Sequence, residues 1–294
     1  MPQLKSNGIM LEYDSFGDAA GRPLLLVMGL GAQMIRWDED FCSLLADRGH
    51  YVIRFDNRDV GLSTKLDDAA VPEMPELVGK LMAGESPEVP YTLDDMADDA
   101  AGVLDALGVE SAHVCGASLG GMVVQTMGIR HGHRLKSMVS IMSTTGSQDV
   151  PPATPEAMAA LTSPTPADLE GYVARNLEVN AVIGSPGFER DLDRARRRSI
   201  ESFHRSVYPD GTARQMAAII AHGDRTERLA SVSVPTLVIH GDADPLVHPD
   251  GGRATARAMP RAELLMIEGM GHDLPVGTWP EIVDAIDRHT AAHH

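Results

Sequence analysis

Cysteine is scarce in this sequence, since the 294 residues contain only Cys42 and Cys115. Two thiols are too few for a zinc site of four cysteines, and the chain has no CxxC pair. Cys115 lies in an apolar, strand-like run and Cys42 in a predicted helix, so we expect two buried thiols in a reducing compartment. The cysteine content therefore gives no indication of a bound metal.

Positive charge is also in short supply. The chain has 25 Lys and Arg against 42 Asp and Glu, a formal net charge of −17, which repels both nucleic-acid phosphates and anionic membrane surfaces. No apolar run reaches the roughly 18 residues that a membrane span needs. The first residues, 1–8, lack the apolar centre of a signal peptide. We expect a cytoplasmic protein that binds neither nucleic acid nor membranes.

What the sequence does contain is a regular alternation of short apolar runs and longer helical patterns. Its hydrophobic content of 43% and charged content of 23% are ordinary for a globular protein. The predicted strands are Ile9–Phe16, Leu24–Met28, Tyr51–Phe55, Ala112–Cys115, Leu135–Met142, Thr236–His240 and Ala262–Ile267. The predicted helices are Asp40–Arg48, Thr92–Leu107, Leu119–His131 and Glu281–His289. This order predicts an α/β fold with a mostly parallel central sheet flanked by helices.

Two stretches interrupt this alternation. Residues 65–91 are rich in Pro, Glu and Gly, and residues 146–230 contain several prolines and helical patterns over 168–182 and 189–207 but no convincing strand. A long insertion between two core strands is typical of a substrate lid. We predict a core made of 1–145 and 231–294, a helical cap over 146–230, and an additional active-site loop over 65–91.

The sharpest motif is Gly116-Ala117-Ser118-Leu119-Gly120. It follows a predicted strand and opens a predicted helix, which is the context of the G-x-S-x-G nucleophile elbow. The glycines leave room for a tight turn, and the helix N-terminus favours negative charge that develops at the serine. The pattern predicts Ser118 as a nucleophile.

A serine nucleophile needs a base and an acid, which follow it in the order acid, then histidine, when the elbow belongs to an α/β sheet. Asp242 and Asp244 both come directly after one predicted strand, and His272 follows the last one. The position after the last strand distinguishes His272 from the other histidines. His131 and His133 end the helix after the elbow, where a solvated pair is expected rather than a metal site.

From its first strands to its last helix the chain resembles the α/β-hydrolase superfamily, and within it the small bacterial esterases that include aclacinomycin methylesterase and the serine-dependent macrolide esterases. The segments that carry the resemblance are Leu26–Gly31, Asp56–Ser63, the Ser118 elbow, Gly241–Pro245 and Gly269–His272. The resemblance implies a catalytic triad of Ser118, Asp244 and His272, because the family places its acid three residues after the strand-ending glycine. It implies an oxyanion hole from the backbone N–H groups of Leu30 and Leu119.

Two segments depart from the family pattern. Met28-Gly29-Leu30 stands where relatives carry His-Gly, which leaves open how that loop is held. In Asp56–Ser63, Asp59 replaces the usual Gly of the family's D-x-R-G-x-G-x-S loop. We expect Asp56 and Arg58 to have a structural role in this loop.

The expected activity is hydrolysis of a carboxylic ester or lactone, a small-molecule substrate, through an acyl-enzyme. We expect contacts with Met28, Met82, Met142 and Phe203, because flexible apolar side chains suit irregular apolar ligands. The acidic surface favours a neutral or cationic, bulky substrate such as a polyketide-type product. Alternatives are a small-ester carboxylesterase, a carbon–carbon bond hydrolase, a perhydrolase and a non-catalytic binding protein. No nucleotide-binding glycine motif is present, so we expect no cofactor.

Overall fold

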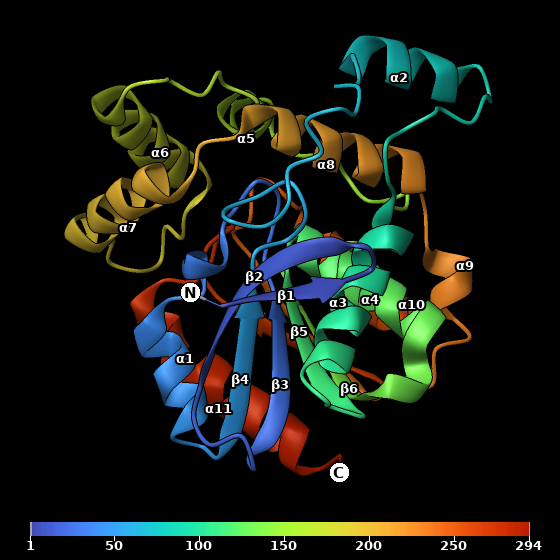
Figure 1. Ribbon diagram of the computed structural model, residues 1–294, viewed down its shortest axis with the longest axis vertical. Helices are drawn as coiled ribbons and strands as arrows, with labels where there is room; N and C mark the ends of the chain where they lie inside the picture. Colours follow the sequence, from blue (N-terminus) through green and yellow to red (C-terminus); the bar gives the residue numbers. More distant parts are fainter. Residues whose placement is uncertain (1, 294) are drawn as a thin grey trace.

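The structure of the chain is a computed structural model that describes residues 2–293. Its centre is an eight-stranded sheet with the order β1-β2-β4-β3-β5-β6-β7-β8 (Figure 1). The strands are β1 (Gln3–Ser6), β2 (Ile9–Phe16), β3 (Arg22–Val27), β4 (His50–Phe55), β5 (Ala112–Ala117), β6 (Leu135–Ile141), β7 (Thr236–Gly241) and β8 (Ala262–Ile267). The pairs β1–β2 and β2–β4 are antiparallel, and the remaining pairs are parallel.

Helices cover both faces of the sheet. α1 (Glu39–Ala46) and α11 (Trp279–Ala291) pack on one face around Phe41 and Trp279, whereas α3 (Leu93–Ala106) and α4 (Leu119–His131) pack on the other around Met96 and Val123. α10 (Pro249–Ala258) contacts β7 and β8. β5 and β7 are buried throughout, and β3 is buried from Leu24 to Val27, because helices cover both faces of the sheet. This burial explains why these strands read as apolar runs.

Between β6 and β7 the described chain forms helices only, namely α5 (Pro155–Leu161), α6 (Leu169–Ile183), α7 (Leu192–Arg205), α8 (Pro209–His222) and α9 (Thr226–Leu229). We call α5–α8 the helical cap. Figure 1 shows the cap above the end of the sheet where the parallel strands finish, with α2 (Met74–Met82) lying against α8. Short 3-10 turns occur at η1 (Met34–Arg36), η2 (Gly132–Arg134) and η3 (Val276–Thr278). No described helix is long and apolar enough to cross a membrane.

The predicted fold class is confirmed, and three elements, β2, α4 and β8, have the predicted bounds. The capping signal at Thr92 is also confirmed, since Thr92 and Asp95 form a capping box at the start of α3. β1 and α10 of the predicted core were missed, and the helices α2, α5, α8 and α9 had no predicted range. β1 is short and polar, and α10 has the sequence PDGGRATARA, with too few apolar residues to show a helical period.

Candidate active site

Ser118 lies at the turn between β5 and α4, with a positive φ of 57°. A side chain at Gly116 would overlap the carbonyl oxygen of Gly120, and one at Gly120 would overlap the carbonyl oxygen of Val27. The two flanking glycines are therefore required by close packing of strand, turn and helix. The strained turn lifts the serine side chain out at the carboxyl end of the sheet.

The structure brings Ser118, His272 and Asp244 together although they are far apart in the sequence. The Ser118 hydroxyl donates to His272 Nε2 at 3.0 Å, and His272 Nδ1–H donates to Asp244 Oδ2 at 2.7 Å. The bond to the carboxylate makes Nδ1 the donor, so Nε2 is left as the acceptor for the serine proton. The backbone N–H of His272 donates to the carbonyl of Ile183 at 2.7 Å, which ties the histidine loop to α6 of the cap.

Asp244 is only 4% exposed and is oriented by its own loop. Its Oδ1 accepts from the N–H groups of Leu246 and Val247 at 2.9 Å each, so Oδ2 is left to face His272. Burial raises the pKa of Asp244, but the charge and hydrogen bond of His272, together with His240 and the N–H of Val247, outweigh burial and hold this pKa below its ordinary value. The carboxylate is thus ionised at neutral pH.

Asp242, the competing acid, points elsewhere. Its Oδ1 accepts from the N–H of Gly269 at 2.7 Å, and its side chain is exposed. A second histidine, His240, lies behind Asp244 with its Nε2 3.6 Å from Oδ2, and it donates to the carbonyl of Val247 at 2.9 Å. Burial lowers the pKa of His240, so it stands beside the carboxylate as a neutral side chain.

The loop after β3 lies against the serine. A Cβ placed on Gly29 would be 3.2 Å from the Cβ of Ser118, so Leu30 follows directly after the point of closest approach. Among the described residues, no acceptor is recorded for the backbone N–H of Leu30 or of Leu119. Both N–H groups flank Ser118, Leu30 from this loop and Leu119 from the first position of α4.

Two side chains that sequence analysis missed hold this loop in place of the family's usual His. Asn57 Nδ2 donates to the carbonyl of Met28 at 2.9 Å, and the N–H of Gly31 donates to Gln215 Oε1 at 2.8 Å. Gln215 in turn donates to the carbonyl of Arg58 at 2.9 Å. The Asp56–Ser63 segment and cap helix α8 therefore both support the loop after β3. No local pattern marks such long-range partners.

The expected structural role of Asp56 and Arg58 agrees with their contacts. Asp56 accepts from the N–H of Met34 at 2.7 Å and pairs with Arg205 of the cap at 3.0 Å, and Arg58 pairs with Asp99 at 2.6 Å. Asp59, which stands in the family's glycine position, has a φ of 65°, the left-handed conformation that favours glycine.

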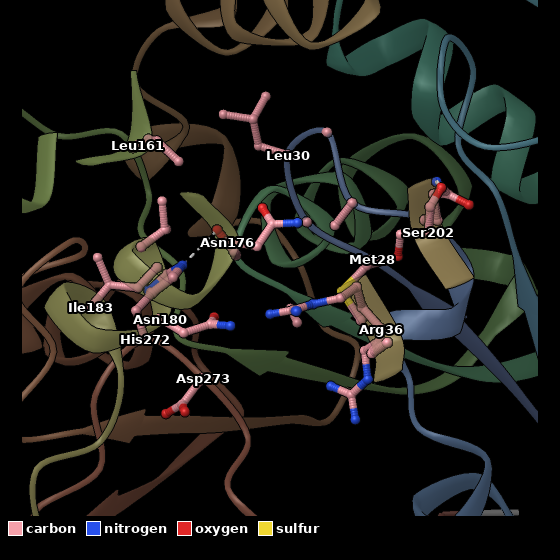
Figure 2. A pocket seen from close by; sticks show the side chains of 18 of the residues that line it. Met28, Leu30, Arg36, Leu161, Asn176, Asn180, Ile183, Ser202, His272 and Asp273 are labelled. Carbon is pink, nitrogen blue, oxygen red and sulfur yellow. Dashed lines mark hydrogen bonds between the residues drawn. The ribbon is translucent and has the colours of Figure 1, made fainter. Parts of the chain in front are cut away.

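A cavity of about 470 Å³ opens above Ser118, between the sheet and the cap. Met28 and Met142 line it, as expected, together with Ile183 and Tyr172 of α6. Figure 2 shows the floor of this cavity, with Met28, Leu30 and His272 among the labelled residues.

Two of the residues expected to contact substrate, Met82 and Phe203, lie outside the cavity lining. Met82 is 85% exposed and lies outside the cavity lining, because it ends α2 on the outer side of the molecule. Phe203 also lies outside this lining, because its ring packs edge-on against Tyr172, with ring centres 5.4 Å apart. Phe203 therefore joins α7 to α6 within the cap.

Residues 65–91, for which we expect an additional active-site loop, do not line the cavity in the described part of the chain. Tyr208 of α8's N-terminus donates to Asp67 at 2.7 Å, and α2 contacts α8. α8 thus separates this segment from the cavity. Polar residues that sequence analysis missed do line the cavity, including Arg36, Asn176, Asn180 and Asp273 (Figure 2).

Comparison with known proteins is consistent with this geometry. A family described as alpha/beta hydrolase fold matches residues 22–276. The chain belongs to this family. It is 29% identical to a rhodomycin D methylesterase of Streptomyces peucetius, over 98% of this chain and 97% of that one, and 30% identical to a rhodomycin D methylesterase of Streptomyces sp. strain C5, over 97% and 96%.

Solved structures show the same fold. An enol-lactonase from Burkholderia xenovorans superposes with a TM-score of 0.74 at 22% identity, covering 99% of this chain and 100% of that one. This α/β hydrolase therefore has the overall fold of that structure over nearly its whole length.

Proposed function

We propose that this protein is a serine hydrolase that cleaves a carboxylic ester or lactone, and that its substrate is a bulky, largely apolar molecule of the polyketide type. The observation that carries the proposal is the hydrogen-bonded chain from Ser118 through His272 to Asp244 at the floor of the cavity. Nucleophile, base and orienting acid are within contact distance of one another, which is the arrangement that acyl transfer requires.

In the proposed first half-reaction, His272 Nε2 accepts the Ser118 proton while Oγ attacks the ester carbonyl. The N–H groups of Leu30 and Leu119 donate to the oxyanion that forms. The tetrahedral intermediate collapses, the alcohol leaves with the proton from His272, and the acyl group remains on Oγ. Asp244 stabilises the imidazolium during this step.

In the second half-reaction, His272 Nε2 takes a proton from water, which attacks the acyl carbonyl. Collapse of the second intermediate returns the proton to Ser118 Oγ and releases the acid. Every proton in this cycle is moved by the chain's own residues, so we expect activity without a cofactor or metal.

Cavity size and homology support the bulky substrate. The cavity volume of about 470 Å³ is within the range of sites that bind drug-sized ligands. The two full-length relatives are named for methyl ester hydrolysis on rhodomycin D. We also propose a cytoplasmic location, because Cys42 and Cys115 are both free and buried, as in a reducing compartment.

The test compares a small aryl acetate, a methyl ester of a polycyclic polyketide and a macrocyclic lactone as substrates for wild type, Ser118→Ala and His272→Ala. We expect the polyketide ester to have the highest kcat/KM. Each variant should lose about 10³-fold or more in kcat, because nucleophile and base act as one unit. Folding is checked by circular dichroism.

Turnover by folded Ser118→Ala at the wild-type rate would refute the serine mechanism. A large preference for the acetate would refute the bulky substrate and leave a small-ester carboxylesterase. No turnover of any ester, with tight binding of the polyketide, would indicate a binding protein instead.

A further inference from the structure

The cavity holds an arginine, Arg36, whose side chain has no recorded partner among the described residues. Arg36 ends η1, on the loop that carries Leu30, and its partly buried side chain lines the cavity (Figure 2). Within residues 2–293 no hydrogen bond or ion pair is recorded for its guanidinium group. The planar guanidinium group of an arginine has five N–H donors. In Arg36 these donors are available to a ligand in the cavity.

Three other arginines that line this cavity differ from Arg36 in having partners, and a fourth, Arg190, is exposed and has no recorded side-chain partner among the described residues. Arg194 pairs with Asp38 at 2.7 Å and with Asp40 at 2.8 Å, and Arg198 also pairs with Asp38. Arg175 donates to the carbonyl of Ser163 at 2.9 Å. These pairs fix the cap helices to each other and to the core. The unpaired state of Arg36 is therefore not a general feature of the cap.

The surroundings of Arg36 compensate its charge only in part. Burial, together with the nearby charge of Arg198, lowers the pKa of Arg36 to about 10, while Asp273 and Tyr172 act in the opposite direction. The group is still protonated at neutral pH. Asp273 makes no ion pair with it, and Asp273 Oδ1 accepts from the N–H of Ser185 at 3.0 Å and from its hydroxyl. An incoming anion would offset the cost of burying this cation.

Two amides face the same cavity from the cap. Asn176 and Asn180 are one helical turn apart on α6, and both line the cavity (Figure 2). The described residues provide no recorded partner for either side-chain amide. Positions four residues apart lie on one helix face, so the two NH₂ groups can act on one ligand.

We propose that Arg36, assisted by Asn176 and Asn180, binds a carboxylate of the substrate, in a subsite separate from the ester carbonyl. The substrate would then be an acid ester: an apolar body with one cleavable ester and one free carboxylate. This inference rests on the proposed function and refines it. It reverses the expectation of a neutral or cationic substrate, because the net charge of −17 describes the whole surface and not the field inside this cavity.

The test uses matched pairs of 4-nitrophenyl esters. One member of each pair is the half-ester of a linear dicarboxylic acid, and the other has a terminal primary amide in place of the carboxylate. Acyl chains of increasing length span the distance between Ser118 and Arg36. The measured quantity is the ratio of kcat/KM for acid over amide, in wild type, Arg36→Gln, Arg36→Lys and Arg257→Gln. Arg257 is exposed on α10, away from the cavity, and controls for the change in net charge.

At the best chain length, wild type should prefer the acid. Arg36→Gln should lower the acid-to-amide ratio about ten- to a hundredfold through KM, since hydrogen bonds to charged groups contribute about 1.5–3 kcal/mol. Arg36→Lys should keep part of the preference, and Arg257→Gln all of it. Turnover of the amide ester by Arg36→Gln shows that the variant is folded and that the hydrolase chemistry is intact.

A ratio that Arg36→Gln leaves unchanged at every chain length would overturn the carboxylate subsite while leaving the ester hydrolase in place. If wild type turns over neither ester, the proposed function fails, and binding then decides the subsite. Calorimetric titration of Ser118→Ala with the same ester pairs should give a lower Kd for the acid member than for the amide member. In the double variant of Ser118→Ala and Arg36→Gln the two Kd values should be equal. Equal Kd values in Ser118→Ala would overturn the proposal.

Discussion

Replacing Asp244 with Asn tests the proposed triad most directly. Asp244 Oδ1 accepts two backbone N–H groups, so the oxygen of an asparagine would take that position and its NH₂ group would face His272. His272 Nδ1 would then have to accept a hydrogen bond, and the ring proton would move to Nε2. In that tautomer Nε2 is a donor and does not take the proton of Ser118.

The size of the loss follows from the geometry. The carboxylate and the ring are joined at 2.7 Å, and their side chains are buried, at 0% and 7% exposure. Two unit charges centred about 4 Å apart interact by about 4 kcal/mol at an effective dielectric constant of about 20, which corresponds to about 10³ in rate. The same substitution in a serine protease triad costs about 10⁴ in kcat, because the tautomer is lost as well. We expect Asp244→Asn to lower kcat by about 10³–10⁴.

The matched control is Asp242→Asn, which removes a charge two residues away. Its carboxylate accepts from Gly269 and not from His272, so kcat should fall by less than about tenfold. Steady-state kinetics on the best ester, with Tm as a measure of folding, decide between the two acids. If the ranking of the two variants were reversed, or if Asp244→Asn kept kcat within tenfold of wild type, the proposed role of Asp244 would be refuted.

Other predictions follow from burial. Met82→Ala should leave kcat/KM within about twofold of wild type, because Met82 is exposed on the surface. Met142→Ala should change KM, because Met142 lines the cavity. Equal effects of the two substitutions on KM would contradict the placement of Met142 at the substrate site. Burial lowers the pKa of His113 to about 3, so only the unfolded chain takes up this proton as the pH falls below about 6.5. Between pH 7.5 and 5.0 the free energy of unfolding should therefore fall, and His113→Gln should reduce that fall by roughly 2 kcal/mol in urea titrations. An unchanged fall would refute the neutral state of His113.

Much of the fold and of the proposed triad could be predicted from the sequence because those signals are local. Apolar runs bounded by glycine predicted the buried strands, and the cap at Thr92 predicted the start of α3. The elbow glycines are required by atoms of the same strand, turn and helix or of the adjoining strand. The position directly after the last predicted strand selected His272 among the histidines, since α/β sheets place their sites at the carboxyl ends of the strands.

The resemblance to esterases was needed to choose between Asp242 and Asp244, and the structure supplies the reason for that choice. Two backbone N–H groups turn the carboxylate of Asp244 toward His272, whereas the N–H of Gly269 holds Asp242 away. Both aspartates lie in one short turn, so composition and spacing do not distinguish them.

Only the tertiary structure decided which side chains line the cavity. Met82 and Phe203 have the right chemistry for an apolar site, but α2 lies outside α8, and Phe203 packs within the cap. Nothing in the local sequence distinguishes Arg36 from the other arginines. Arg36 lines the cavity because cap helices that are distant in the sequence pack above the loop after β3. Its side chain is left without a recorded partner among the described residues, while the nearby Asp38 pairs with Arg194 and Arg198. Such long-range placement leaves no periodicity in the local sequence, because each contact joins residues from separate elements.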